Sequence, residues 1–157
     1  MARGPRYRLL FRRRREGKTD YYSRKKHLRS NKPRAIIRKT LKNMIVQVAS
    51  AKPEGDNVIA SAFSKELRKF GWKGGSGNTP SAYLTGYVAG IRASKKGVKE
   101  AVLDIGLSAP SKGSRVFAAL KGVIDAGVSV NHDESVLPSR ERIRGEHVAN
   151  CAKTTAE

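Results

Sequence analysis

The positive charge of this chain is concentrated at its beginning. Seventeen of the 33 Lys and Arg residues lie in the first 42 positions, where Glu16 and Asp20 are the only two acids. Four of these cations, Arg12–Arg15, are consecutive. A buried charge needs a partner of opposite sign, and this segment contains too few acids to provide one. We therefore expect these residues to lie outside any packed core and to bind a polyanion.

The same segment is rich in aromatic residues. Tyr7, Phe11, Tyr21 and Tyr22 are four of the ten aromatic residues in the chain. Guanidinium groups suit phosphate oxygens, and flat rings stack on unpaired bases, so the combination favours folded RNA over a uniform duplex. A nuclear-localisation or histone-like arm is the alternative, because runs of Lys and Arg also serve those roles.

The rest of the composition limits the class of protein. A chain of 157 residues is long enough for one domain that buries roughly 70% of its unfolded surface. The single Cys151 excludes an internal disulfide, and His27, His132 and His147 lack the spacing of a zinc site, so we expect no metal and no other cofactor. No secretory signal and no run of roughly 20 apolar residues is present, which predicts a cytoplasmic protein without a membrane partner.

After Pro33, strand and helix signals alternate along the chain. Runs rich in Ile and Val predict strands, and apolar residues spaced by three and four predict helices. This order predicts an α/β fold, in which helices pack on a mixed sheet. The predicted strands are residues 34–41, 44–50, 58–64, 99–105 and 128–130. The predicted helices begin at Ser64 and after the N-caps Thr79, Ser111 and Ser139.

For two of these helices the sequence also predicts which residues share one face. In the helix that follows Thr79, close packing on the sheet is expected at Gly86 and Gly90. Its buried stripe is predicted to be Leu84, Tyr87, Val88 and Ile91. The helix after Ser139 is predicted to continue with Ile143, His147 and Cys151 on one face.

Catalytic signatures are weak. A metal-dependent nuclease needs clustered carboxylates, and although Asp104 lies on a predicted strand, the first three strands contain no acid. The glycine-rich residues 71–78 lack the spacing of a nucleotide-phosphate cradle and predict a surface loop. We therefore expect a binding protein and not an enzyme.

A family resemblance rests first on residues 11–26, FRRRREGKTDYYSRKK. This stretch closely resembles the N-terminal signature of the 5S-rRNA-binding family of the large ribosomal subunit, the eighteenth large-subunit family, in its archaeal and eukaryotic form. The resemblance continues through residues 121–127 and 137–147 and covers essentially the whole chain. It implies a ribonuclease-H-like sandwich without catalysis and an archaeal source. It also implies that the protein attaches 5S rRNA to the large-subunit rRNA in the central protuberance, beside other large-subunit proteins.

The resemblance and the charge together define the expected site and domains. The resemblance carries RNA contacts over to Arg12, Arg13, Arg14, Arg15, Lys18, Tyr21, Tyr22, Arg24, Lys25 and Lys26. Charge and position add Arg3, Arg6, Arg8, Arg29, Lys32, Arg34 and Arg38. We expect an extended basic RNA-binding arm at 1–32, with a short helical turn near 21–28, an α/β core at 33–137 and a C-terminal helix and tail at 138–157. An architectural DNA-binding or chromatin protein is the alternative function.

Overall fold

A five-stranded mixed sheet forms the centre of the protein. The computed structural model describes residues 4–154, the last three by their backbone alone. The strands are arranged in the order β3-β2-β1-β4-β5. They comprise β1 (Arg34–Lys39), β2 (Met44–Ala51), β3 (Asp56–Phe63), β4 (Glu100–Asp104) and β5 (Ser129–Val130). The predicted α/β class with a mixed sheet is therefore confirmed, and each predicted strand is present with ends shifted by no more than two residues.

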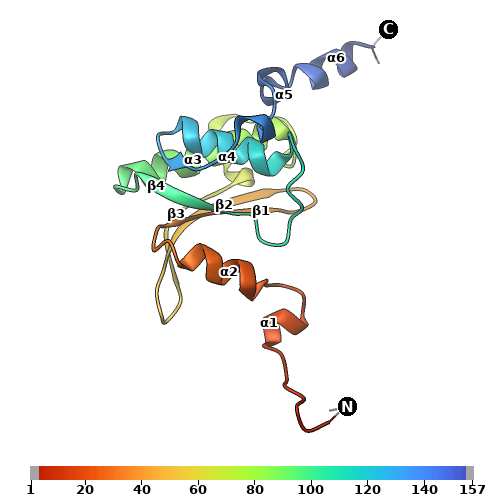
Figure 1. The fold of residues 1–157 in the computed structure, drawn as a ribbon. Helices are drawn as coiled ribbons and strands as arrows, with labels where there is room; N and C mark the ends of the chain where they lie inside the picture. The colour runs from red at the N-terminus through yellow and green to blue at the C-terminus, as the bar shows by residue number, and fades with distance from the viewer. Residues whose placement is uncertain (1–3, 155–157) are drawn as a thin grey trace.

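Two long helices cover one face of this sheet. They are α3 (Thr79–Lys95) and α4 (Arg115–Asp125), and Figure 1 shows both on the same side of the strands. Strands β1, β2 and β3 form an antiparallel meander, whereas β4 and β5 run parallel to β1 and are reached through α3 and α4. Two parallel strands that lie side by side need a long crossover connection of this kind, since a tight turn cannot join them.

The alternation along β1 divides its side chains between the two faces. Ala35 and Ile37 pair with Val48 and Val46 of β2, and all four are fully buried against the helices. The intervening residues of β1, which include the two arginines of this strand, face the opposite side of the sheet. That opposite side is not covered by α3 or α4 (Figure 1), and we call it the open face.

Small residues allow α3 and α4 to approach each other closely. A Cβ atom on Gly86 of α3 would lie 2.0 Å from the carbonyl oxygen of Ala119, and one on Gly122 of α4 would lie 2.2 Å from that of Tyr83. Close packing at Gly86 is confirmed, but its partner is α4 and not the sheet as predicted. The buried stripe of α3 consequently consists of small residues: Ala82, Thr85, Gly86, Ala89, Gly90 and Ala93.

The larger residues of α3 lie beside this stripe, so the predicted stripe is wrong. Leu84, Val88 and Ile91 are half-buried, and Tyr87 is exposed. A helix that approaches its neighbour through glycine and alanine has no room for large side chains on the contact line. On α4 the larger residues Val116, Phe117, Leu120 and Val123 are buried, and Ile124 is half-buried.

Several helix boundaries differ from the prediction for local reasons. The N-cap of α3 is Asn78 and not Thr79, since the Asn78 side chain accepts a hydrogen bond from the Ser81 amide at 2.9 Å. Helix α4 begins at Arg115 and not after Ser111, because Gly113 has a left-handed φ of 66°. The segment predicted as a helix from Ser64 is a 3₁₀ helix, η1 (Ser64–Phe70).

The C-terminal helix is divided in two. Ser139 caps α5 (Arg140–Arg144) as predicted, by accepting from the Arg142 amide at 3.4 Å. Gly145 then has a φ of 82°, which ends α5 before α6 (Glu146–Thr154) begins. The predicted continuous helix is therefore wrong. A short 3₁₀ helix, η2 (Glu134–Val136), precedes this region, and α6 extends away from the sheet (Figure 1).

The N-terminal segment lies on the other side of the sheet from α3 and α4 (Figure 1). It contains α1 (Arg12–Arg15) and α2 (Tyr21–Leu28). The helical turn predicted near residues 21–28 is confirmed, whereas α1 was not predicted. The described part of this segment, residues 4–32, has no buried residue, so its position depends on polar contacts with the domain.

Candidate nucleic-acid interface

Helix α1 places four guanidinium groups in a single turn. The carbonyl of Phe11 accepts hydrogen bonds from the amides of Arg14 and Arg15 at 2.9 and 3.0 Å, which starts the turn. Glu16 lies 3.7 Å from Arg12 and 2.9 Å from Lys18. These are exposed pairs, which contribute little to stability. The turn therefore presents most of its positive charge to the solvent.

Helix α2 is defined by its capping residues. Asp20 accepts hydrogen bonds from the amide of Tyr22 at 2.9 Å and from the Ser23 hydroxyl at 2.6 Å. The Ser23 hydroxyl and then these backbone amides lower the pKa of Asp20. Lys25 and Lys26 occupy the last turn, where the helix dipole favours cations. Asp20 therefore fixes the start of a helix whose other end is strongly basic.

Aromatic rings lie between these cations. The rings of Phe11 and Tyr21 contact each other, with centroids 5.2 Å apart, and so connect α1 to α2. Tyr22 is 71% exposed, and the ammonium of Lys26 lies 4.4 Å from its ring centroid. Phe11 and Tyr7 are also exposed. Exposed rings next to cations are suited to stacking on unpaired bases.

A buried carboxylate organises the open face of the sheet. Asp104, at the end of β4, lies 3.0 Å from Arg34 and 2.8 Å from Arg38, both on β1. It also accepts from the Gly106 amide at 2.9 Å. Burial works to raise the pKa of Asp104, but the hydrogen bond and charge of Arg38 and the Gly106 amide outweigh it, so the pKa lies below its usual value. Asp104 is therefore an anion that holds two arginines in place.

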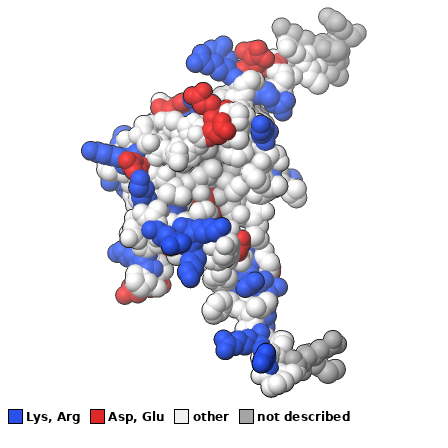
Figure 2. Space-filling view, viewed as in Figure 1, with Lys and Arg blue, Asp and Glu red and all other residues white. Residues whose placement is uncertain are grey.

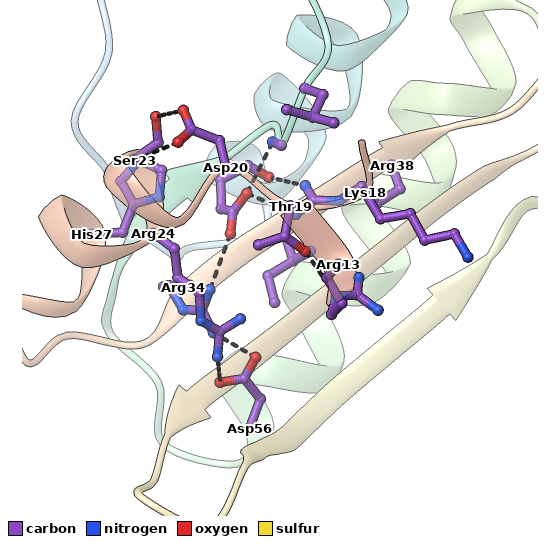
Figure 3. Close-up of a pocket in the computed structure, with 14 residues that line it drawn as sticks. Arg13, Lys18, Thr19, Asp20, Ser23, Arg24, His27, Arg34, Arg38 and Asp56 are labelled. Carbon is purple, nitrogen blue, oxygen red and sulfur yellow. Dashed lines mark hydrogen bonds and ion pairs between the residues drawn. The ribbon is translucent and has the colours of Figure 1, made fainter. Parts of the chain in front are cut away.

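A second carboxylate connects the domain to α2. Asp56, at the start of β3, lies 2.7 Å from Arg34 and 2.9 Å from Arg24 of α2. Burial works to raise the pKa of Asp56, but hydrogen bonds from Arg34 and Arg24 outweigh it and lower the pKa. Figure 3 shows Arg24, Arg34 and Asp56 converging in this way. On the same side of the sheet, Lys32 pairs with Glu100 at 2.5 Å and so ties the end of the segment to β4.

A cavity of about 220 Å³ lies between the N-terminal segment and the open face. Its walls come from both sides, as Figure 3 shows. The N-terminal side provides Arg13, Lys18, Thr19, Asp20, Ser23, Arg24 and His27, and the other side provides Arg34, Ile36, Arg38, Asp56, Asp104, Gly106 and Leu107. The predicted site residues from the two segments thus meet along one polar seam.

The predicted cations divide into two groups by their partners. Six lie within 4.0 Å of a carboxylate: Arg12, Lys18, Arg24, Lys32, Arg34 and Arg38. Eight have no carboxylate at that distance among the residues that the structure describes: Arg6, Arg8, Arg13, Arg14, Arg15, Lys25, Lys26 and Arg29. Arg3 lies outside the described residues. Figure 2 shows Lys and Arg side chains along the N-terminal segment and on the domain above it.

Arg34 differs from the other predicted contacts. It is only 1% exposed, and Asp56 and Asp104 both balance its charge. Arg38 is more accessible, although it also donates to the backbone carbonyls of Ile37 and Asp104 at 3.0 and 2.6 Å. Arg34 therefore supports the interface from beneath, whereas Arg38 reaches its surface.

Sequence reasoning missed the role of the two acids. Asp104 was considered only as a possible metal ligand, and Asp56 was not among the predicted site residues. Within residues 4–154, no group of three or more His, Cys, Asp and Glu side chains is placed to hold a metal ion. The available signal was Asp104, an isolated acid on a predicted strand. It indicates an ion pair with Arg34 and Arg38 only when β4 is known to lie beside β1 in the sheet.

No helix within residues 4–154 is long and apolar enough to cross a bilayer.

Comparisons with known proteins give a family match over most of the chain. The profile of the family described as "Ribosomal large subunit proteins 60S L5, and 50S L18" matches residues 5–100 and 90–133. Three archaeal relatives, each called "Large ribosomal subunit protein uL18", align with the whole chain. The relative from Staphylothermus marinus is 58% identical over 78% of its length, that from Aeropyrum pernix 58% over 74%, and that from Korarchaeum cryptofilum 57% over 80%.

Proposed function

Because this chain belongs to the uL18 family of large ribosomal subunit proteins, we propose that it binds 5S rRNA and attaches it to the large-subunit rRNA in the central protuberance. Its relatives are structural proteins of the ribosome, and the chain is accordingly a ribosomal component and not an enzyme. Its partners are rRNA and neighbouring proteins of the large subunit.

One observation carries the proposal for the RNA contact. Eight cations between Arg6 and Arg29 have no carboxylate partner among the described residues, and exposed rings lie between them. Such cations gain most when they displace the counterions of a phosphate backbone. The rings add stacking, which is available on unpaired bases and not on the outside of a regular duplex. Folded RNA with loops and junctions supplies both features.

The same contacts support a separate role for each of three parts of the chain. Residues 1–32 act as the basic RNA-binding arm, residues 33–137 as the α/β core and residues 138–157 as a C-terminal extension. The strand order β3-β2-β1-β4-β5, with β2 antiparallel to β1, supports a ribonuclease-H-like sandwich for this core. The arm is attached to the core mainly by ion pairs such as Arg24–Asp56 and Lys32–Glu100, so it can exchange carboxylates for phosphates when RNA arrives.

A competition experiment tests this function. The full chain is bound to labelled 5S rRNA at near-physiological salt, because low salt lets any cationic segment bind any nucleic acid. Unlabelled 5S rRNA and duplex DNA of equal charge are then added as competitors. Strong preference for 5S rRNA is expected. Equal competition by duplex DNA would instead support an architectural DNA-binding protein.

A further inference from the structure

A second basic surface lies at one end of the sheet, apart from the N-terminal segment. The end of β1, the start of β2 and the end of β3 meet there, since Arg38 pairs with Ile45 and Ile45 pairs with Phe63. The turn 40–43, η1 and the loop 71–78 extend from this end. We call the following exposed residues the loop-end surface: Lys42, Arg68, Lys69, Phe70 and Lys73.

The glycine-rich loop gives this surface a defined shape. The Trp72 indole donates to the Gly75 carbonyl at 3.2 Å, and its ring lies so close to Gly74 that a Cβ there would be 3.0 Å away. A Cβ on Gly77 would lie 3.1 Å from the backbone of Lys42. The loop is thus packed against the turn 40–43, and Gly74 and Gly77 are explained by these close approaches.

The loop is also tied to the helical layer. Arg115, the first residue of α4, donates to the Gly77 carbonyl at 2.6 Å. The Ser64 hydroxyl accepts from the Met44 amide at 3.0 Å, which joins the start of η1 to the start of β2. Lys42 and the residues of η1 are therefore carried on segments that contact the same end of the sheet.

The charge on this surface is not balanced within the protein. Among the described residues, no carboxylate lies within ion-pair distance of Lys42, Arg68, Lys69 or Lys73. The nearby acid, Glu66, is already engaged, because it accepts from Arg92 at 2.7 Å and from the Phe63 amide at 3.1 Å. Four cations without partners indicate that the occupant is a polyanion.

The exposed ring of Phe70 favours one class of polyanion over the others. Phe70 is 69% exposed and lies between Lys69 and the turn at Gly71, where a left-handed φ of 85° ends η1. An acidic protein would balance the charge, but an exposed flat ring next to Lys69 in the sequence suits unpaired bases between phosphates. RNA is thus the favoured occupant, and a protein partner is an outcome that the experiment separates.

We propose that the loop-end surface is a second RNA-binding surface, which contacts an RNA segment different from the one bound by the N-terminal segment. The inference rests on the proposed function, since attaching one RNA to another requires two contact surfaces on one chain. Phe70 stacks on an unpaired base, and Lys42, Lys69 and Lys73 contact phosphates of the same segment.

The experiment uses the full chain with transcripts of 5S rRNA and of large-subunit rRNA as separate probes. The test variant is Lys42→Ala, Lys69→Ala, Lys73→Ala, and the matched control is Lys52→Ala, Lys95→Ala, Lys99→Ala, three exposed lysines away from this surface. A third variant, Arg13→Ala, Arg14→Ala, Arg15→Ala, reports on the N-terminal segment. Circular dichroism and thermal melting establish that each variant is folded.

The expected result is a loss of about tenfold in affinity for large-subunit rRNA in the loop-end variant, relative to the control. The N-terminal variant should instead lose affinity for 5S rRNA, and the combined variant should show both losses without enlarging either, because separate surfaces act independently. Phe70→Ala should lose about tenfold and Phe70→Trp should retain binding.

Affinities equal to the control for both RNAs would overturn the inference. A protein would then be the expected partner of the loop-end surface. That outcome is distinct from failure of the proposed function, in which the N-terminal variant would bind 5S rRNA as tightly as the unmodified chain.

Discussion

Arg34 and Asp104 form an ion pair inside the protein, with 3.0 Å between their nearest atoms. Both side chains are less than a tenth exposed. The pair joins β1 to β4, two strands that are separated in the sequence by the whole of α3. Because Asp104 also holds Arg38, this one carboxylate positions both arginines that β1 directs to the open face.

Replacing Asp104 tests its structural role. Asp104→Asn should lower the free energy of unfolding by about 3 kcal/mol, since it leaves the buried Arg34 with a single carboxylate partner. Chemical denaturation at pH 7 measures the change. Glu100→Gln is the matched control, because its ion pair with Lys32 is exposed on both sides and should leave the stability unchanged. Equal stability of the two variants would contradict this role.

Acid pH should remove the same stabilisation. The pKa values of Asp56 and Asp104 both lie below the usual value, so near pH 4 each group binds fewer protons in the folded than in the unfolded state. Their contribution is complete above the unfolded pKa of about 4 and is lost as the pH falls through the folded pKa. The unfolding free energy of the wild type should fall below pH 4, and that of Asp104→Asn should fall less steeply.

Tyr22 should contribute to RNA binding more than Tyr21. Its ring is exposed, whereas the Tyr21 ring contacts Phe11. Tyr22→Ala should weaken 5S rRNA binding by about 1–3 kcal/mol, the value of one stacked base, and Tyr22→Phe should retain binding. Tyr87→Ala on α3 is the control for removing an exposed tyrosine elsewhere. Filter binding at constant salt measures each affinity, and an unchanged affinity for Tyr22→Ala would remove the stacking role.

Gly86 should tolerate no larger residue. The Cβ of Gly86→Ala would meet the backbone of Ala119, so α3 and α4 must separate. We expect a loss of about 1–3 kcal/mol despite the higher helix propensity of alanine. Gly75→Ala is the control, because the nearest atom to its Cβ would be 3.9 Å away. Thermal unfolding of both variants compares them, and equal melting temperatures would contradict close helix packing at this position.

The elements with strong local signals were predicted well from the sequence. The run rich in Ile and Val at residues 44–50 placed β2 correctly, and Ser139 marked the start of α5. The concentration of cations before Pro33 correctly indicated a segment without a buried core. In each case the deciding interaction is local, or is a property of the segment's own composition.

The remaining features depend on pairs of residues far apart in the chain. The buried face of α3 is set by α4, so the large residues that looked like its core lie to the side. The burial of Arg34 follows from Asp56 and Asp104, which the register of three strands brings together. Left-handed backbone angles at Gly113 and Gly145 delay the start of α4 and end α5, and the apolar pattern does not reveal these angles.

The salt dependence of 5S rRNA binding tests the central claim most directly. Arg13, Arg14 and Arg15 have no carboxylate partner among the described residues, so phosphates are expected to neutralise them. Replacing all three with Ala should lower the slope of log Kd against log salt by about one for each phosphate that the variant no longer neutralises. The control variant at Lys52, Lys95 and Lys99 should keep the slope of the unmodified chain. If the arginine variant also kept the full slope, the N-terminal segment would not be the part of the protein that binds RNA.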